Sequence, residues 1–249
     1  MKTSNKLLVG FFSLFFLCLF LFLAAAFRHY KEEFLIGNGN SIPKNMALPS
    51  IRKIEASGHL RLFLVQGQTP ALRIQADENI HPAIALSEKE GVLKVTLQRK
   101  VAPNTQVDVF ITVDSLQYIA LAAAAHLETP NGLRGARLKI EGTSGASGIV
   151  QLAYDDLICE SSSGARLLLG GTAGNCLFHF SSGGSIDALQ LQAQRAKVEG
   201  SSGGSAEIQV ADELTADLSS GAFLEYLGNP KLGEIHTASG GTIGKKGNF

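Results

Sequence analysis

The feature that most constrains the fold is a short motif, Ser-Gly followed by Ala or Gly, which recurs through the C-terminal half of the chain. Its serines are 18 to 20 residues apart, and they are Ser144, Ser163, Ser182, Ser202, Ser220 and Ser239. A fixed period of this length is typical of solenoids, in which each repeat is one coil stacked on the last. Ala123, Ala124 and Ala125 are expected to form a degenerate earlier copy, because they come about one period before Ser144.

The repeat also has an internal order. Apolar residues occupy the fourth and sixth positions before nearly every repeat serine, as Cys159 and Leu157 do before Ser163, and a second apolar pair follows, as Leu167 and Leu169 do. This alternation indicates two short strands and two turns per repeat, with one face buried. Equivalent strands then run in the same direction, which consecutive hairpins cannot achieve.

The sequence therefore predicts an all-β fold, a parallel β-solenoid with coils of about 19 residues. We expect right-handed winding, the general rule for parallel crossovers. Gly in the corners permits the positive φ of a tight turn. Gly148, an extra glycine in the first full repeat, is expected to form a bulge.

The rest of the chain divides by composition. Residues 123–249 hold the Ser-Gly solenoid, and residues 51–122 hold segments that alternate apolar and polar residues with period two, typical of strands. Residues 28–50 mix charges with Gly, Asn and Pro, and indicate a spacer.

Residues 7–27 contain no charge, and as a transmembrane helix they would span about 31 Å, close to the roughly 30 Å of bilayer hydrocarbon. Lys2 and Lys6 lie in residues 1–6, which predicts a cytoplasmic tail and places residues 28–249 outside the cytoplasm, in the cell envelope. A cleaved signal peptide, with small residues at Ala24 and Ala26, is the alternative and would leave a secreted or periplasmic protein. A buried soluble helix is a third interpretation.

The three cysteines are Cys18, Cys159 and Cys176. Cys159 and Cys176 face one core from neighbouring coils but are offset by two residues. Their Cα atoms are then roughly 8 Å apart, beyond the usual disulfide range of about 4.4–6.8 Å. We expect two buried free thiols.

A polar residue stands three positions before every repeat serine, and these candidate binding residues are Glu141, Glu160, His179, Glu199, Asp217 and His236. Stacked coils bring them into one row, with neighbours about 4.8 Å apart. Adjacent acids repel one another, so Lys139 and Lys197 on the same face are expected to pair with them. A solvated face with ion pairs is the simpler interpretation. The alternative is weak, unselective binding of Ca²⁺, Zn²⁺ or a cationic partner.

The sequence indicates neither an enzyme nor a cofactor site. Residues 200–204 match G-x-S-x-G, but no helical pattern follows, as a nucleophile elbow requires, and Ser202 is simply one of the repeat serines. We expect no catalytic residue, no dedicated metal site and no cofactor. The formal net charge of zero, from 22 basic and 22 acidic residues, excludes a dedicated nucleic-acid binder.

The order of these elements resembles the head GIN domain family of putative autotransporter adhesins, over about residues 51–245. The resemblance rests on IEASGHLRLFLVQG, then GVLKVTLQ and VDVFITV, then recurring motifs such as SSSGARLLLGG and SSGGSIDAL. ALAAAAHLE stands where a first Ser-Gly copy is expected. The family implies an exported all-β domain and offers no catalytic residues.

Three functions remain open at this point. The first is an envelope-anchored adhesion module without catalytic activity, held in the membrane by residues 7–27, whose partner is a cell-surface polymer or an envelope protein. The second is a structural or sensory envelope protein without a ligand of its own. The third is a glycan-active enzyme, which the absence of Trp disfavours.

Overall fold

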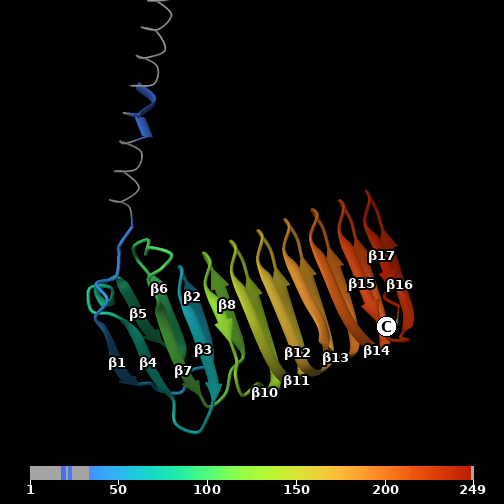
Figure 1. Cartoon of the computed structure of the whole chain (residues 1–249). Helices are drawn as coiled ribbons and strands as arrows, with labels where there is room; N and C mark the ends of the chain where they lie inside the picture. Colours follow the sequence, from blue (N-terminus) through green and yellow to red (C-terminus); the bar gives the residue numbers. More distant parts are fainter. Residues whose placement is uncertain (1–17, 21, 24–33, 248–249) are drawn as a thin grey trace, which may run out of the picture.

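The computed structural model describes residues 18–20, 22–23 and 34–247, and its strands form one continuous sheet wound into a solenoid (Figure 1). The first strands are β1 (Ser41–Ala47), β2 (Lys53–Ser57), β3 (Arg61–Gln66), β4 (Ala71–Asp77), β5 (Ile84–Lys89), β6 (Val92–Leu97), β7 (Val107–Val113), β8 (Tyr118–Ala122) and β9 (His126–Glu128). The later ones are β10 (Leu133–Gly142), β11 (Ser147–Ser161), β12 (Arg166–Phe180), β13 (Ser185–Gly200), β14 (Ser205–Leu218), β15 (Phe223–Leu227), β16 (Lys231–Thr237) and β17 (Thr242–Lys245). A 3₁₀ turn, η1 (His81–Ala83), precedes β5.

The predicted parallel solenoid is confirmed, with about seven turns. From β8 and β9 onward each coil pairs in parallel with the next, up to β16 and β17. The parallel stacking also includes β2, β3, β6 and β7, although β6 and β7 lie on the outer side of β2 and β3, out of chain order. Antiparallel β1, β4 and β5 close this end of the stack.

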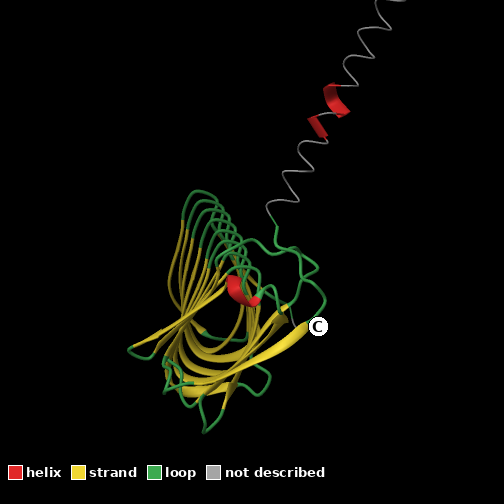
Figure 2. Cartoon of the chain, turned by 90° about the vertical axis from the view of Figure 1, so that its left-hand side faces the viewer, coloured by secondary structure: helices red, strands yellow, loops and turns green. Residues whose placement is uncertain are grey.

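The predicted division of each coil into two short strands is wrong for the central coils. There a single strand of 14 to 16 residues runs from one corner to the next and bends on the way, so that each coil has one turn (Figure 2). The inward and outward alternation shifts by one residue at the bend: Tyr154 and Leu157 are both buried, although two residues, Asp155 and Asp156, separate them. The pairing of β11 with β12 keeps one register on both sides of this bend, so the strand needs no second turn.

The corners confirm the role assigned to the Ser-Gly motif. Ser144 and Gly145 have φ of 53° and 71°, and the amide of Ala146 donates to the carbonyl of Thr143 at 3.1 Å. Two consecutive residues with positive φ define a tight turn of type I′. Ala123 and Ala124 adopt the same conformation, with φ of 51° and 65°, which confirms that they form a degenerate copy.

The core is the inside of the coil, and it is built from the predicted apolar positions. Leu157, Cys159, Leu167 and Leu169 are all buried. The predicted bulge at Gly148 is wrong, because the register runs through this residue without a shift. Gly148 instead faces inward, where a Cβ atom would lie 3.2 Å from a methyl group of Leu167. The glycine thus makes room for a large neighbour.

The predicted membrane helix of residues 7–27 lies mostly outside the described residues. Residues 18–20 and 22–23 of that segment are helical. In the part of the chain that the structure describes, no helix combines the length and the apolar character needed to cross a bilayer.

Candidate functional site

The six polar residues predicted to form a row do so on the outer face of the solenoid. Each is in register with the next, in the order Glu141, Glu160, His179, Glu199, Asp217 and His236. They come from β10, β11, β12, β13, β14 and β16. We call these six residues the polar row. The register follows directly from the constant period of the repeat, because residues at equivalent positions must stack.

Ion pairs offset the repulsion between neighbouring acids, as predicted. The Nζ atom of Lys139 lies 2.6 Å from Glu141 and 2.9 Å from Glu160, so one ammonium bridges two carboxylates. Lys197 donates to Glu199 at 2.8 Å, and Nδ1 of His179 lies 3.0 Å from the other oxygen of Glu199. Two lysine ammonium groups and the imidazole of His179 therefore contact carboxylates of the polar row.

Two carboxylates of the polar row are held in the charged form. Burial alone would raise the pKa of Glu141, but hydrogen bonds from Lys139 and from the Tyr118 hydroxyl outweigh it and keep this pKa below its ordinary value. Burial and the same carboxylate raise the pKa of Tyr118 to about 12. The hydrogen bond from Lys197 lowers the pKa of Glu199, and the charge of His179 acts in the same direction.

A groove of about 480 Å³ runs beside the polar row, across the coils. Its lining includes Glu160, His179, Glu199 and Asp217 and, two residues further along each coil, the residues just before the repeat serines, namely Ser162, Ser181, Ser201 and Ser219. We call these four serines the hydroxyl row. The sequence analysis missed this row, although a hydroxyl residue at that position in successive repeats was a visible signal.

The two ends of the polar row lie outside this groove. His236 lines an adjoining hollow together with Asp217, Glu213 and Glu234. Glu141 instead accepts a hydrogen bond from Tyr118 at 2.6 Å. Within residues 34–247 no three His, Cys, Asp or Glu side chains come close enough together to hold a metal ion. The polar row thus offers carboxylates singly or in pairs.

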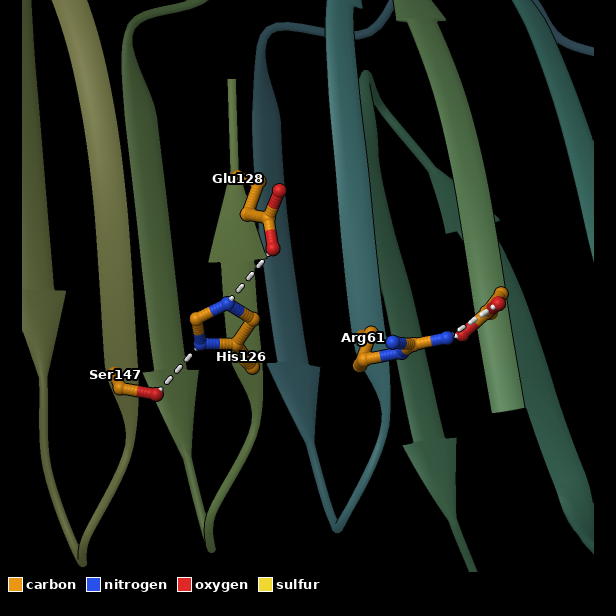
Figure 3. Close-up of polar contacts among 5 residues, drawn as sticks. Arg61, His126, Glu128 and Ser147 are labelled. Atoms are coloured by element: carbon orange, nitrogen blue, oxygen red, sulfur yellow. Dashed lines mark hydrogen bonds and ion pairs between the residues drawn. The ribbon is translucent and has the colours of Figure 1, made fainter. Parts of the chain in front are cut away.

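A second polar cluster, not predicted from the sequence, lies on another face of the coils (Figure 3). Nδ1 of His126, on β9, shares a 2.7 Å hydrogen bond with the hydroxyl of Ser147 on β11, and Nε2 lies 3.2 Å from Glu128. Because a carboxylate only accepts, Nε2 is the donor, and Nδ1 of the neutral ring then accepts from Ser147. Arg61 on β3 lies beside the cluster and donates to Asp108 at 2.7 and 2.8 Å.

The hydrogen bonds run from Ser147 through His126 to Glu128, which is the order of nucleophile, base and acid in a catalytic triad. Acyl transfer also needs donors for the developing oxyanion. The amide of Ser147 already donates to the carbonyl of Ala125 at 2.9 Å within the sheet. The cluster is therefore best described as cross-strand hydrogen bonding. Its sequence signal was that His126 and Ser147 occupy equivalent positions after successive corners.

The comparisons with known proteins agree with this architecture. Residues 51–230 match the family described as "Putative auto-transporter adhesin, head GIN domain", and the chain belongs to this family. No curated protein matches.

Among solved structures, the chain is similar to a putative adhesin from Bacteroides fragilis, with a TM-score of 0.80, 21% identity, and coverage of 85% of this chain and 100% of that chain. It is also similar to a putative adhesin from Parabacteroides distasonis, with a TM-score of 0.70, 18% identity, and coverage of 86% of this chain and 100% of that chain. A putative adhesin from Parabacteroides merdae has a TM-score of 0.69 and 22% identity, with coverage of 86% of this chain and 100% of that chain. These likenesses support the fold.

Proposed function

We propose that the protein is an exported, membrane-anchored adhesion module that binds an extended cell-surface polymer along the groove between the polar row and the hydroxyl row. The observation that carries this proposal is the repetition of the groove. Coil after coil presents an acid or histidine beside a serine in the groove lining, at intervals of about 4.8 Å. The family description, an adhesin head domain, supports the same function.

A repeating groove suits a repeating ligand. Carboxylates accept hydrogen bonds, and serine hydroxyls both donate and accept. Each contact at an exposed surface is weak, but several contacts to one chain act together and give useful avidity. Neutral or amino-bearing polysaccharides offer the donors that these carboxylates need, whereas a uronic acid polymer would be repelled by them.

The anchor in this proposal is the uncharged segment 7–27, which would hold the solenoid at the outer side of the membrane in the cell envelope. Resistance of the full-length protein to carbonate extraction from membranes, together with an intact N-terminal sequence, tests the anchor. Release in soluble form with a new N-terminus after residue 26 would show a cleaved signal peptide instead.

Binding is tested with the full chain in detergent micelles and immobilised polysaccharides of three kinds: neutral, amino-bearing and uronic. We expect retention on the first or second kind and none on the third. Changing Ser162, Ser181 and Ser201 together to Ala should reduce retention. The matched control is Ser185→Ala with Ser205→Ala, since these serines lie in register after the corners, outside the groove lining. Equal retention of both variants, or no retention of the native chain, would refute the proposal.

The absence of catalysis is also part of the proposal and is tested at the second cluster. A fluorophosphonate probe attacks activated serines, and we expect it to leave Ser147 unlabelled in the native chain. Labelling of Ser147 that is lost in His126→Gln would instead identify an acyl-transfer centre and overturn the noncatalytic part of the proposal.

A further inference from the structure

A pocket of about 430 Å³ lies at the opposite end of the stack from β16 and β17, a volume typical of sites for small ligands. It lies between the corners of the first coils and the connection from β6 to β7. The residues that line it are Phe34, Ser57, Gly58, His59, Leu97, Gln98, Arg99, Lys100, Val101, Pro103 and Ala123. The pocket is separate from the groove and from the cluster of Ser147, His126 and Glu128.

The part of the pocket lining that the structure describes is both apolar and basic. Its apolar part includes Phe34, Leu97 and Val101. The ionisable residues among the described part of the lining are His59, Arg99 and Lys100, and these are basic. The ammonium of Lys100 lies 5.9 Å from the centre of the Phe34 ring, so the basic and apolar parts are in contact. A ligand that fits both parts has an anionic group joined to an apolar body.

The position of the pocket along the chain points to the source of such a ligand. The backbone around Phe34 is fixed to the pocket, because the Leu35 amide donates to the Lys100 carbonyl at 2.8 Å and the Ala102 amide donates to the Leu35 carbonyl at 2.9 Å. Figure 1 shows the described segment that leads into β1 beside the connection from β6 to β7. Only six residues separate Phe27, the end of the uncharged segment, from Phe34, and they reach at most about 21 Å.

We propose that this pocket binds an anionic phospholipid of the membrane in which the protein is anchored. The negative headgroup lies against Arg99, Lys100 and His59, and the adjoining apolar part of the lipid contacts Phe34, Leu97 and Val101. Basic residues close to a membrane attract anionic lipids. Here only six residues join the proposed anchor to Phe34, so the basic residues of the pocket stay close to the membrane. This inference rests on the anchor in the proposed function, and carbonate extraction tests that anchor independently.

The chain contains no Trp, so a single introduced Trp reports on the pocket without background. Pro103→Trp places the probe at the exposed rim of the pocket, and Phe223→Trp, also exposed, places a control probe on β15 at the far end of the stack. Each full-length variant is reconstituted in nanodiscs of phosphatidylcholine with a fixed fraction of acyl-brominated phosphatidylglycerol or acyl-brominated phosphatidylcholine. Bromine quenches Trp emission only on close contact.

We expect brominated phosphatidylglycerol to quench Pro103→Trp at least twofold more than brominated phosphatidylcholine does, and to leave Phe223→Trp unaffected. Adding Arg99→Gln and Lys100→Gln should remove the preference, while Lys44→Gln with Lys53→Gln, outside the pocket lining, should not. Equal quenching by the two lipids would overturn the lipid assignment, even for a protein that carbonate leaves in the membrane. An emission shift of Pro103→Trp with inorganic phosphate alone would mark a free-anion site and also overturn it.

Discussion

Cys159 and Cys176 face the same core from neighbouring coils but are offset by two residues, since Cys159 is opposite Phe178 and Cys176 is opposite Leu157. Both thiols are buried and free, as the register predicted. Burial raises the pKa of Cys176 to about 12 and raises that of Cys159 as well. The neutral thiol is a poor nucleophile, so both groups should be inert in the folded protein.

The prediction for these thiols uses a Cys18→Ser background, because Cys18 is exposed. We expect iodoacetamide to leave the native chain unmodified and to add two groups after denaturation, as read by intact mass. The mass should not change with reductant. A peptide that joins Cys159 to Cys176 under non-reducing conditions would show that the coil register is wrong.

Leu167 and Leu168 are adjacent on β12 and point to opposite faces, which gives a matched pair for the stability of the core. Leu167 is fully buried, whereas Leu168 is 36% exposed. Leu167→Ala should lower the free energy of unfolding by about 2–5 kcal/mol, because it leaves a cavity between coils. Leu168→Ala should cost less than about 1 kcal/mol. Denaturant unfolding of the full chain in detergent checks both, and a larger loss for Leu168→Ala would invert the assigned faces.

The period of the repeat explains why so much of this fold could be predicted. A constant spacing with one internal order puts Glu160 beside His179 and Leu157 beside Cys176, whatever the details of the turns. The bend within β12 could not be told from a turn, because the break in alternation between Ala173 and Cys176 is the same for one bent strand and for two strands joined by a turn. The place of β6 and β7 beyond β2 was also hidden, since chain order does not tell on which edge of the stack a strand is added.

The candidate site was only partly visible in the sequence for a related reason. The polar row consists of acids and histidines at one repeat position, and such residues are easily recognised in a repeat whose neighbouring positions are mostly apolar. The hydroxyl row is hidden among the serines of the corners, where Ser162 directly precedes Ser163, the serine of the repeat motif. The structure separates them: Ser163 has positive φ in the corner, whereas Ser162 lines the groove.

Lys139 bridges Glu141 and Glu160, while Lys197 forms an ion pair with Glu199. Lys139→Gln should therefore destabilise the chain more than Lys197→Gln, because it leaves two adjacent carboxylates without their shared cation. Since Lys139 is about one-third exposed, solvent screening limits the loss to about 1 kcal/mol. Unfolding at low and high salt checks this, and we expect the difference between the variants to shrink at high salt.

Stability should fall on the acid side of neutrality through Glu141 and Glu199. The pKa of each is lower in the folded chain than its ordinary value of 4.5, so the folded state binds fewer protons than the unfolded state. This stabilisation is fully present above pH 4.5 and is lost as the pH falls through the folded values. Urea midpoints measured from pH 7 to pH 3 should drop, and Glu141→Gln should flatten the drop. An unchanged slope in that variant would contradict the assignment.

Gly171 and Gly164 both have positive φ, but for different reasons, and alanine substitution should separate them. At Gly164, in a corner with φ of 74°, no atom lies within 4 Å of an added Cβ, so Gly164→Ala should cost only the left-handed conformation, about 1 kcal/mol. At Gly171, with φ of 110°, the added Cβ would collide with the carbonyl oxygen of Leu152 in the coil before it. Gly171→Ala should therefore cost about 2–4 kcal/mol, since strain and overpacking combine. Thermal and denaturant unfolding of the two variants measure this difference, and equal losses would mean that the coils separate locally at Gly171 at no cost.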